Sequence, residues 1–406
     1  MGVHSKLGSL CLDGFTPVKF LASNSRSLSN IWILKSNIGN QLLFCKVFVQ
    51  SNGIERVNDM TGLAYESKVY SHIKKQLSKP EYCDFKENFI QLESVCKNLT
   101  FSELMSKVGV SDNVTEARVK RNIRYMICGD TTKRPALDKG DGDEHVSGCD
   151  DVVVVPENLQ YTIIATRSPE NNTNRVMKLS HFVRKPGISF EAKASVIAMT
   201  ALSIYAMHQM GICHNDQHWD NILVAMTAKR RHYKYTYDNV LYKFNTNARP
   251  LLFDWDWAQL CEGGSKNEYL NDFPQIFPAD RSRADKTRDI FRFYIELRFM
   301  MKHLNKRDMI EKIDRVFLTD VEQVNVVDYI WSPNKPVIIE AIREEIEKFI
   351  KFDVGLLLNI LECTRGCNYK LKKDRLCLRN AKLPGIHCWQ HVSKEQKRNH
   401  ENKQNR

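Results

Sequence analysis

The stretch that decides the fold is Gly211–Val224, GICHNDQHWDNILV, taken together with Leu251–Ala258, LLFDWDWA. The first places Asp216 and Asn221 shortly before an apolar run, and in the second an apolar strand ends at Asp254. Phosphoryl transfer from a nucleotide needs one carboxylate near the attacking hydroxyl, and a second carboxylate with an amide oxygen to hold magnesium. The order of these residues favours that chemistry, whereas a polar turn followed by a loop cap is the structural alternative.

These two segments resemble a known family. The phrase HQMGICHND, Trp-Asp directly before Asn221, and the Asp254-x-Asp256 ending resemble the divergent serine/threonine protein kinases coded by large DNA viruses of the iridovirus type. The H-x-D-x-x-x-x-N and D-x-D pair is also similar to aminoglycoside and choline kinases. The resemblance covers most of residues 16–361. It implies an α+β chain with a bilobal protein-kinase-like fold, in which the N-lobe is rich in strands and the C-lobe is mainly helical.

The resemblance also implies roles for the acidic residues. Asp216 would be the catalytic base, and Asn221, Asp254 and Asp256 would bind magnesium beside ATP. Asp256 replaces the glycine of the family's D-F-G signature, so it either binds a second magnesium or limits the movement of its own segment. His214 would support the loop backbone and take no part in proton transfer.

A further charged pair is expected in the N-terminal part. Lys46 interrupts the apolar run LLFCKVFV, where an unpaired ammonium group would be costly to bury. Glu66 lies in a segment whose apolar residues recur at helical spacing. In the family, a lysine so placed binds the α- and β-phosphates and pairs with a helix glutamate, which makes Lys46 and Glu66 candidates for these roles. The alternatives are a solvent-facing edge-strand lysine and a surface glutamate paired within its own helix.

The sequence departs from the family pattern at several positions. The loop expected to cover the nucleotide phosphates, Ser23-Asn24-Ser25, contains no glycine, so its role in ATP binding competes with that of an ordinary polar hairpin loop. His218 stands where a lysine is usual, and Asn215 stands where an arginine is usual. No A-P-E sequence follows Asp256, which gives little support to recognition of a peptide substrate.

The predicted organisation follows from the periodicity. We expect strands within residues 16–50, 89–105 and 159–168, a buried helix over 188–210, an extended hairpin over 229–249, and helical segments over 288–304 and 338–361. We predict an N-lobe at 16–167 with an insertion near 106–151, and a C-lobe at 168–361. We further predict a small module at 362–391 and a basic, disordered tail at 392–406. Asp289 resembles a family residue that anchors the catalytic loop, although an acid at a helix N-terminus is the alternative.

The C-terminal module is defined by its cysteines. Cys388 and His391 form a Cys-x-x-His pair, and Cys367 and Cys377 precede them among lysines and arginines. This pattern favours a small zinc-binding module of three cysteines and one histidine, in which Cys363 is an alternative to Cys367. Unpaired thiols in a disordered tail are the other interpretation.

Composition sets the remaining limits. The 406 residues are 42% hydrophobic, which suits a globular chain with a sizeable core. The sequence shows no signal peptide and suggests no membrane span, so we expect reduced thiols and a cytoplasmic protein. The resemblance would place that protein in an infected host cell or packaged in the virion. The net charge of +12 is compatible with nucleic acid, with acidic substrates or with no specific partner. The basic, tyrosine-rich 229–249 segment is compatible with nucleic acid, whereas an ordinary two-sided hairpin is the alternative.

The function predicted from these observations is transfer of the ATP γ-phosphoryl group to serine or threonine hydroxyls of proteins. Two alternatives stay open. The first is a small-molecule phosphotransferase of the aminoglycoside- or choline-kinase type. The second is a pseudokinase scaffold that binds a protein or nucleic acid, which the glycine-free loop favours and the retention of Lys46, Asp216, Asn221 and Asp254 opposes.

Overall fold

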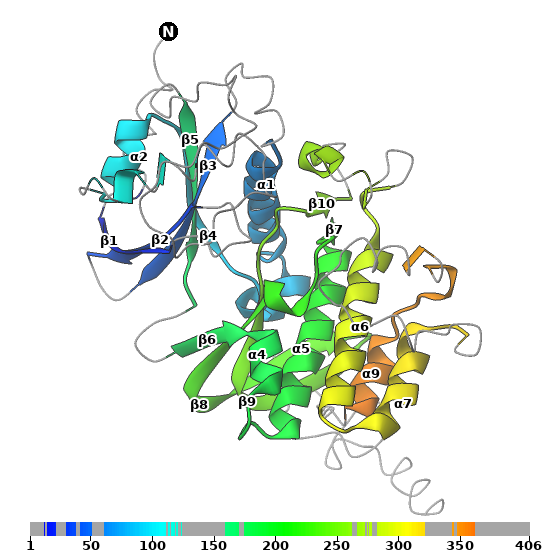
Figure 1. Cartoon of the computed structure of the whole chain (residues 1–406). Coiled ribbons are helices and arrows are strands. Elements are labelled where there is room, and N and C mark those ends of the chain that lie inside the picture. The colour runs from blue at the N-terminus through cyan, green and yellow to red at the C-terminus, as the bar shows by residue number, and fades with distance from the viewer. Residues whose placement is uncertain are drawn as a thin grey trace, which may run out of the picture. The chain divides into compact units, whose positions relative to one another are not determined.

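The computed structural model is a mixed α+β chain of antiparallel sheets and helices, which confirms the predicted class at this coarse level (Figure 1). It describes residues 12, 14–21, 30–37, 41–50, 61–110, 113, 115–117, 119–120, 123, 159–169, 174–261, 266–272, 274, 276–277, 282–320, 343–344 and 347–361. The predicted phosphate loop, most of the insertion predicted near 106–151 and the predicted zinc ligands lie outside these residues. The chain divides into two compact units. Unit 1 contains Met1–Lys75, Ile90–Thr173 and Asp254–Ala284, and unit 2 contains Gln76–Phe89, Asn174–Phe253 and Asp285–Arg406.

Unit 1 is built on a five-stranded antiparallel sheet with the strand order β1-β2-β3-β5-β4. The strands are β1 (Phe15–Leu21), β2 (Asn30–Ser36), β3 (Leu42–Gln50), β4 (Leu92–Leu99) and β5 (Gln160–Arg167). The strands predicted within 16–50 and 159–168 are therefore confirmed. The further elements of unit 1 are helices α1 (Thr61–Gln76) and α2 (Phe101–Lys107), strand β10 (Gln259–Leu260) and the 3-10 turn η5 (Glu268–Asp272).

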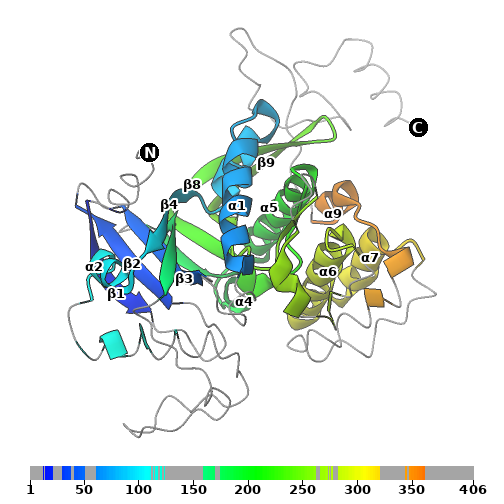
Figure 2. The ribbon, with the colours of Figure 1, turned by 90° about the horizontal axis from the view of Figure 1, so that it is seen from above.

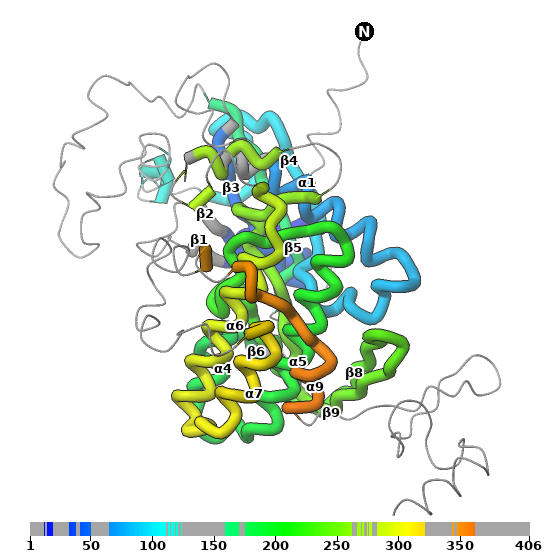
Figure 3. Tube along the Cα trace, turned by 90° about the vertical axis from the view of Figure 1, so that its right-hand side faces the viewer, coloured from blue at the N-terminus to red at the C-terminus, as the bar shows by residue number. Residues whose placement is uncertain are grey.

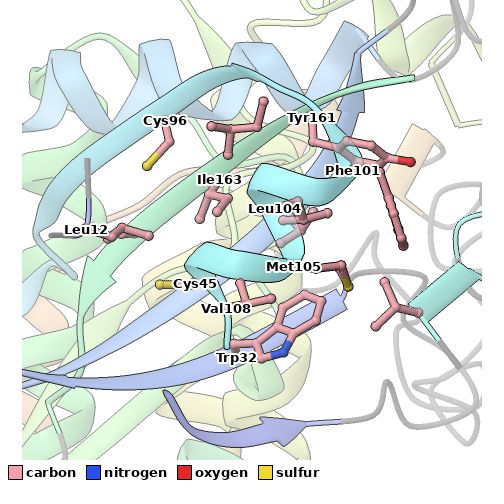
Figure 4. Packing of buried hydrophobic residues seen from close by; sticks show 14 of the residues in the cluster. Leu12, Trp32, Cys45, Cys96, Phe101, Leu104, Met105, Val108, Tyr161 and Ile163 are labelled. Carbon is pink, nitrogen blue, oxygen red and sulfur yellow. The ribbon is translucent and has the colours of Figure 1, made fainter. Parts of the chain in front are cut away.

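One face of this sheet forms the hydrophobic core of unit 1. Alternate residues of β3, among them Cys45 and Val47, join a buried cluster with Trp32, Ile163 and the apolar residues of α2. Figure 4 shows α2 presenting Phe101, Leu104 and Met105 to this cluster. Because successive strand residues point to opposite faces, Lys46 lies on the face away from the cluster.

Helix α2 differs from the sequence-based expectation, which continued the strand through residue 105. The strand β4 ends at Leu99, and Thr100 begins a helix as its N-cap. The Thr100 hydroxyl accepts from the Glu103 amide at 3.2 Å, and the Glu103 carboxylate accepts from the Thr100 amide at 2.8 Å. This reciprocal capping box satisfies two helix-end donors, and it outweighs the β propensity of the preceding apolar residues.

Unit 2 is organised around α5 (Phe190–Gln209), which lies within the helix predicted over 188–210. Ser189 caps its first turn by accepting from the Ala192 amide at 3.2 Å, and the chain leaves the helix through Gly211 at φ 74°. Among the described residues α5 is the one helix long and apolar enough to cross a membrane by length and composition. Most of it is buried inside unit 2, as in the core helix of a globular protein.

The sheet of unit 2 contains a long hairpin, as predicted, with the strand order β6-β8-β9. Strand β6 (Asn174–Lys178) pairs with the start of β8 (Ile222–Tyr237), and β8 pairs along its length with β9 (Val240–Leu252). Asp238 and Asn239 both have positive φ at the two-residue turn, a conformation that these residue types tolerate. Figure 3 shows the turn end of β8 and β9 beside α9.

The other elements of unit 2 are mostly helical. They are η2 (Pro80–Asn88), α4 (Leu179–Arg184), β7 (Ile212–Cys213), η4 (Trp219–Asn221), α6 (Lys286–His303), α7 (Arg307–Phe317), η6 (Glu347–Phe349) and α9 (Val354–Ile360). In Figure 2, α6, α7 and α9 lie side by side. The helical prediction for 338–361 is confirmed in part: α9 lies within it, but residues 351–353 are not helical, and Asp353 caps α9 by accepting from the Leu356 amide at 2.8 Å.

The sequence led us to expect reduced thiols, but not all cysteines of the described residues are reduced. Cys45, Cys83, Cys213 and Cys261 are free thiols, whereas Cys96 is disulfide-bonded. Burial raises the pKa of the Cys45 thiol to about 12, so this thiol is protonated at neutral pH and unreactive.

Candidate functional site

Unit 1 gathers three carboxylates around one ammonium group. The Nζ atom of Lys46 lies 3.2 Å from Glu66 Oε2, 3.0 Å from Asp254 Oδ1 and 2.5 Å from Asp256 Oδ1. The Glu66 side chain is only 2% exposed, whereas that of Asp254 is 37% exposed. The sequence singled out Lys46 with Glu66, and Asp254 with Asp256; the structure brings the two pairs together around Lys46.

Local structure explains how these side chains meet. Lys46 lies in β3 between partners Ile31 of β2 and Ile164 of β5, so its position is fixed by pairing on both sides. Glu66 occupies the second turn of α1. Asp254 has a φ of 67°, the left-handed conformation, which an aspartate adopts more readily than most residues. That backbone turn brings Asp254 and Asp256 to the same ammonium group.

Charge and burial oppose each other at this cluster. Burial disfavours the ammonium form of Lys46, but the carboxylates of Asp254, Asp256 and Glu66 hold its pKa well above the ordinary value. Burial raises the pKa of Glu66, and the charge of Lys46 opposes that rise only in part. Lys46 is therefore a permanent cation, and the cluster depends on it for neutralisation.

A hydrogen-bonded clamp ties the acidic segment to α1 within unit 1. The Tyr65 hydroxyl accepts from Gln259 Nε2 and from the Leu260 amide, each at 3.0 Å. Gln259 Oε1 accepts from the Asn267 amide at 2.9 Å, and Asn267 Nδ2 donates to the carbonyl of Asp256 at 2.9 Å. Because Tyr65 directly precedes Glu66, this chain of bonds holds the two sides of the cluster together.

The cluster offers ligands that suit a hard divalent cation. One oxygen atom from each of Glu66, Asp254 and Asp256 lies within 4.8 Å of the others, with no sulfur or imidazole ligand among them. Magnesium prefers such oxygen ligands and binds through one or two carboxylates together with water and phosphate oxygens. The chemistry of these donors fits magnesium, with the partly exposed Asp254 and Asp256 as its ligands.

Unit 2 places Asp216 at the centre of a second polar group. Asn221 Nδ2 donates to the carbonyl and to Oδ2 of Asp216, each at 3.0 Å. His218 Nε2 lies 3.4 Å from Asp216 Oδ2, and Arg292 Nη2 lies 3.6 Å from Asp216 Oδ1. Asp216 and Asn221 were both predicted as site residues, and their side chains are in contact.

The surroundings of Asp216 favour its charged form. Burial opposes ionisation, but the hydrogen bond and charge of His218, followed by the charge of Arg292, hold the pKa of Asp216 below its ordinary value. Conversely, burial lowers the pKa of His218, but the hydrogen bond to Asp216 and the charge of Asp216 together raise it above its ordinary value. Asp216 is thus a carboxylate at neutral pH, able to accept a hydrogen bond from a hydroxyl.

Asp289 of α6 anchors the backbone of the loop that carries Asp216. The carboxylate of Asp289 accepts from the backbone amide of His214 at 2.8 Å and from that of Asn215 at 2.7 Å. It also lies 3.0 Å from His208 Nε2. The anchoring contact expected from the resemblance is confirmed. Asn215, at φ 64°, turns the backbone so that both amides face the same carboxylate.

Gln217 follows Asp216 and provides a test of local packing. Its side chain is fully buried, and among the described residues neither amide atom has a hydrogen-bond partner. We expect Gln217→Leu to leave stability unchanged or to raise it by about 1 kcal/mol, because a similar apolar shape removes two unsatisfied polar atoms. Thermal unfolding followed by circular dichroism measures this.

The matched control is Gln259→Leu. The Gln259 amide donates to Tyr65 and to the Leu260 carbonyl and accepts from Asn267, so the same substitution breaks satisfied hydrogen bonds. We expect it to lower the melting temperature. A loss of stability in both variants would show that the Gln217 amide is hydrogen-bonded in solution.

Sequence reasoning missed several residues of these groups. Arg292 gave no motif, although it lies three positions after Asp289 on the same helix and therefore shares its face, which is a usable signal. The Tyr65–Gln259 clamp joins residues 194 positions apart and has no local signal. Ser23, Asn24 and Ser25 lie outside the described residues, as do Cys367, Cys377, Cys388 and His391.

The sequence matches no protein-family model and no curated protein. Any assignment of function to this chain therefore depends on the residues and geometry described above.

Proposed function

We propose that this chain is a magnesium-dependent phosphotransferase of the protein-kinase-like type, which transfers the ATP γ-phosphoryl group to serine or threonine hydroxyls of proteins. The proposal includes the bilobal kinase-like fold and the C-terminal zinc module, both of which are predictions from sequence. It assigns the nucleotide phosphates to the Lys46 cluster of unit 1 and the attacking hydroxyl to the Asp216 group of unit 2.

The observation that carries the proposal is the contact of Lys46 with Glu66 and with Asp254. Asp254 is 208 residues away from Lys46 in the sequence, yet Nζ lies 3.0 Å from its carboxylate. Burying a cation among several carboxylates is unfavourable for folding, so such a cluster is expected where a function uses it. Phosphoryl transfer does, because the ammonium binds phosphate oxygens and magnesium neutralises the charge that develops on them.

Asp216 and Asn221 support the same reaction from unit 2. The ionised Asp216 carboxylate accepts the hydrogen bond of the incoming hydroxyl and orients its oxygen towards the phosphoryl group. Asn221 holds that carboxylate through Nδ2 and has an amide oxygen left for magnesium. The hydrogen bond of His218 and the charge of Arg292 favour the ionised form of Asp216.

The test is incorporation of phosphate from γ-labelled ATP and magnesium into a casein-type protein mixture and into the chain itself. We expect incorporation by the parent, and a loss of at least about 100-fold in Asp216→Asn, which keeps the shape and removes the charge. Asp220→Asn is the matched control, since Asp220 lies in the same loop and bonds to Ser180 and Lys178. Equal loss in both variants would contradict the role of Asp216.

A second candidate is a small-molecule phosphotransferase, favoured by the contact of Asp256 with Lys46 in the Asp254-x-Asp256 arrangement. The same assay with choline and an aminoglycoside as acceptors separates the two. Transfer to either one, with none to protein, would replace the protein-kinase proposal. Binding of neither ATP nor magnesium-ATP would instead favour the non-enzymatic scaffold.

A further inference from the structure

The register of the hairpin breaks in β8 within a stretch of four consecutive basic residues, Lys229, Arg230, Arg231 and His232, here named the basic bulge. On either side of it the burial of β8 is mixed, but Ala228 and the four basic residues are all exposed. The bulge lies within unit 2 and takes no part in the Asp216 group.

The register of the hairpin creates this exposure. Met226 pairs with Ala248 and Arg231 pairs with Thr246, so β8 advances five residues while β9 advances two. The residues between Met226 and Arg231 are not paired with β9, as in a β-bulge, whereas Arg231 and His232 are back in the ladder opposite Thr246 and Asn245. The Thr227 hydroxyl closes the base of the bulge, because it lies 2.6 Å from the Lys229 carbonyl and 3.3 Å from the Asn247 carbonyl.

The rest of the hairpin is fixed by aromatic packing. Tyr233, Tyr235 and Phe244 are buried, and the Tyr235 hydroxyl donates to Asn88 Oδ1 at 2.9 Å. At the turn, Tyr237 packs edge-on against Tyr205 of α5 with ring centroids 4.8 Å apart. The bulge is therefore presented from a rigid support. The buried tyrosines also cannot stack on nucleic-acid bases, which removes the feature that had suggested single-stranded nucleic acid.

The charge of the hairpin is strongly one-sided. Residues 222–252 contain six lysines and arginines and a single acidic residue, Asp238. Arg249 is paired with Glu87, but within the described part of the chain no ion pair involves a residue of the basic bulge. Such a concentration of unpaired cations on a rigid support attracts an anionic partner.

The sheet edge indicates the form of that partner. Strand β6 pairs with β8 only from Leu223 to Thr227, and no described strand continues along that edge past Thr227. An extended peptide can add to such an edge through backbone hydrogen bonds while its side chains meet those of the strand. We propose that the basic bulge is a docking surface for an extended, acidic segment of a partner protein. The surface is independent of phosphoryl transfer.

The test measures binding of a fluorescein-labelled peptide, (Glu-Asp-Ser) repeated four times, to the full chain by fluorescence anisotropy without ATP. The variant K229Q/R230Q/R231Q removes three exposed charges, and we expect about tenfold weaker binding or more. The control K302Q/R307Q/K312Q removes three charges from exposed positions of α6 and α7. We expect it to bind like the parent, which separates location from net charge.

Three outcomes would overturn the proposal. Equal weakening in both variants would mean that net charge alone attracts the peptide. If the parent bound a duplex RNA of equal charge and the bulge variant lost that binding while it still bound the peptide like the parent, the bulge would be assigned to nucleic acid. Self-association of the bulge variant, with unchanged peptide affinity, would mean that the charges only protect the strand edge from other copies. Circular dichroism verifies that both variants are folded.

Discussion

Asp289→Ala is expected to lower the free energy of unfolding of unit 2 by about 3 kcal/mol or more, because it leaves the buried amides of His214 and Asn215 without an acceptor. Each unsatisfied buried donor costs about 1–3 kcal/mol, and His208 loses its partner as well. Asp289→Asn retains the size of the side chain but turns an amide N–H towards one of these donors. We therefore expect it to recover only a small part of the loss.

Hydrogen–deuterium exchange locates the effect. Exchange in peptides covering 211–221 should accelerate in Asp289→Ala before the rest of unit 2 responds, since local opening of the loop no longer breaks those bonds. Glu311→Ala is the control, because its exposed ion pair with Arg315 contributes little to stability. Unchanged exchange in the loop, with a stability loss no larger than in the control, would refute the anchoring role.

The elements of the fold were predictable where local signals agree with packing. The strands of unit 1 and helix α5 follow apolar periodicity and end at recognisable caps such as Ser189 and Gly211. The failures have equally local causes. Thr100 and Glu103 form a capping box that was overlooked, and Asp353 begins a helix where the apolar pattern had suggested continuity.

The candidate site was predictable in its residue types but not in its connections. A lysine within an apolar strand needs a partner, and the family resemblance, not the burial cost, named Glu66 as the candidate. Spacing alone related Asp216 to Asn221. By contrast, Arg292 and Gln259 act through contacts between elements far apart in sequence, and the side-chain pairings of such elements are set by tertiary packing.

The β8–β9 hairpin shows a third reason why sequence-based prediction was incomplete. Its tyrosines and basic residues suggested a surface that stacks bases, because sequence alternation does not reveal which face is buried. Packing against Asn88 and Tyr205 places the tyrosines inside, and a register shift turns the basic residues outward. A bulge of this kind depends on the partner strand, so β8 read by itself could not have predicted it.

Lys46→Met is expected to lower phosphoryl transfer by about 10³-fold, because it removes the cation that the proposed function assigns to the nucleotide phosphates. It also leaves Glu66, Asp254 and Asp256 without the ammonium group that all three contact. Lys35→Met, the same substitution at an exposed position of β2, is the control and should leave activity unchanged.

A second readout for Lys46→Met does not depend on activity. With the ammonium gone, Asp254 and Asp256 lose the cation that both contact, and a divalent cation can take its place among the oxygens of the cluster. We therefore expect magnesium to raise the melting temperature of Lys46→Met more than that of the parent or of Lys35→Met, with sodium at equal ionic strength as the reference. If magnesium raised the melting temperature equally in all three proteins and Lys46→Met were fully active, Lys46 would not be the charge on which the cluster depends.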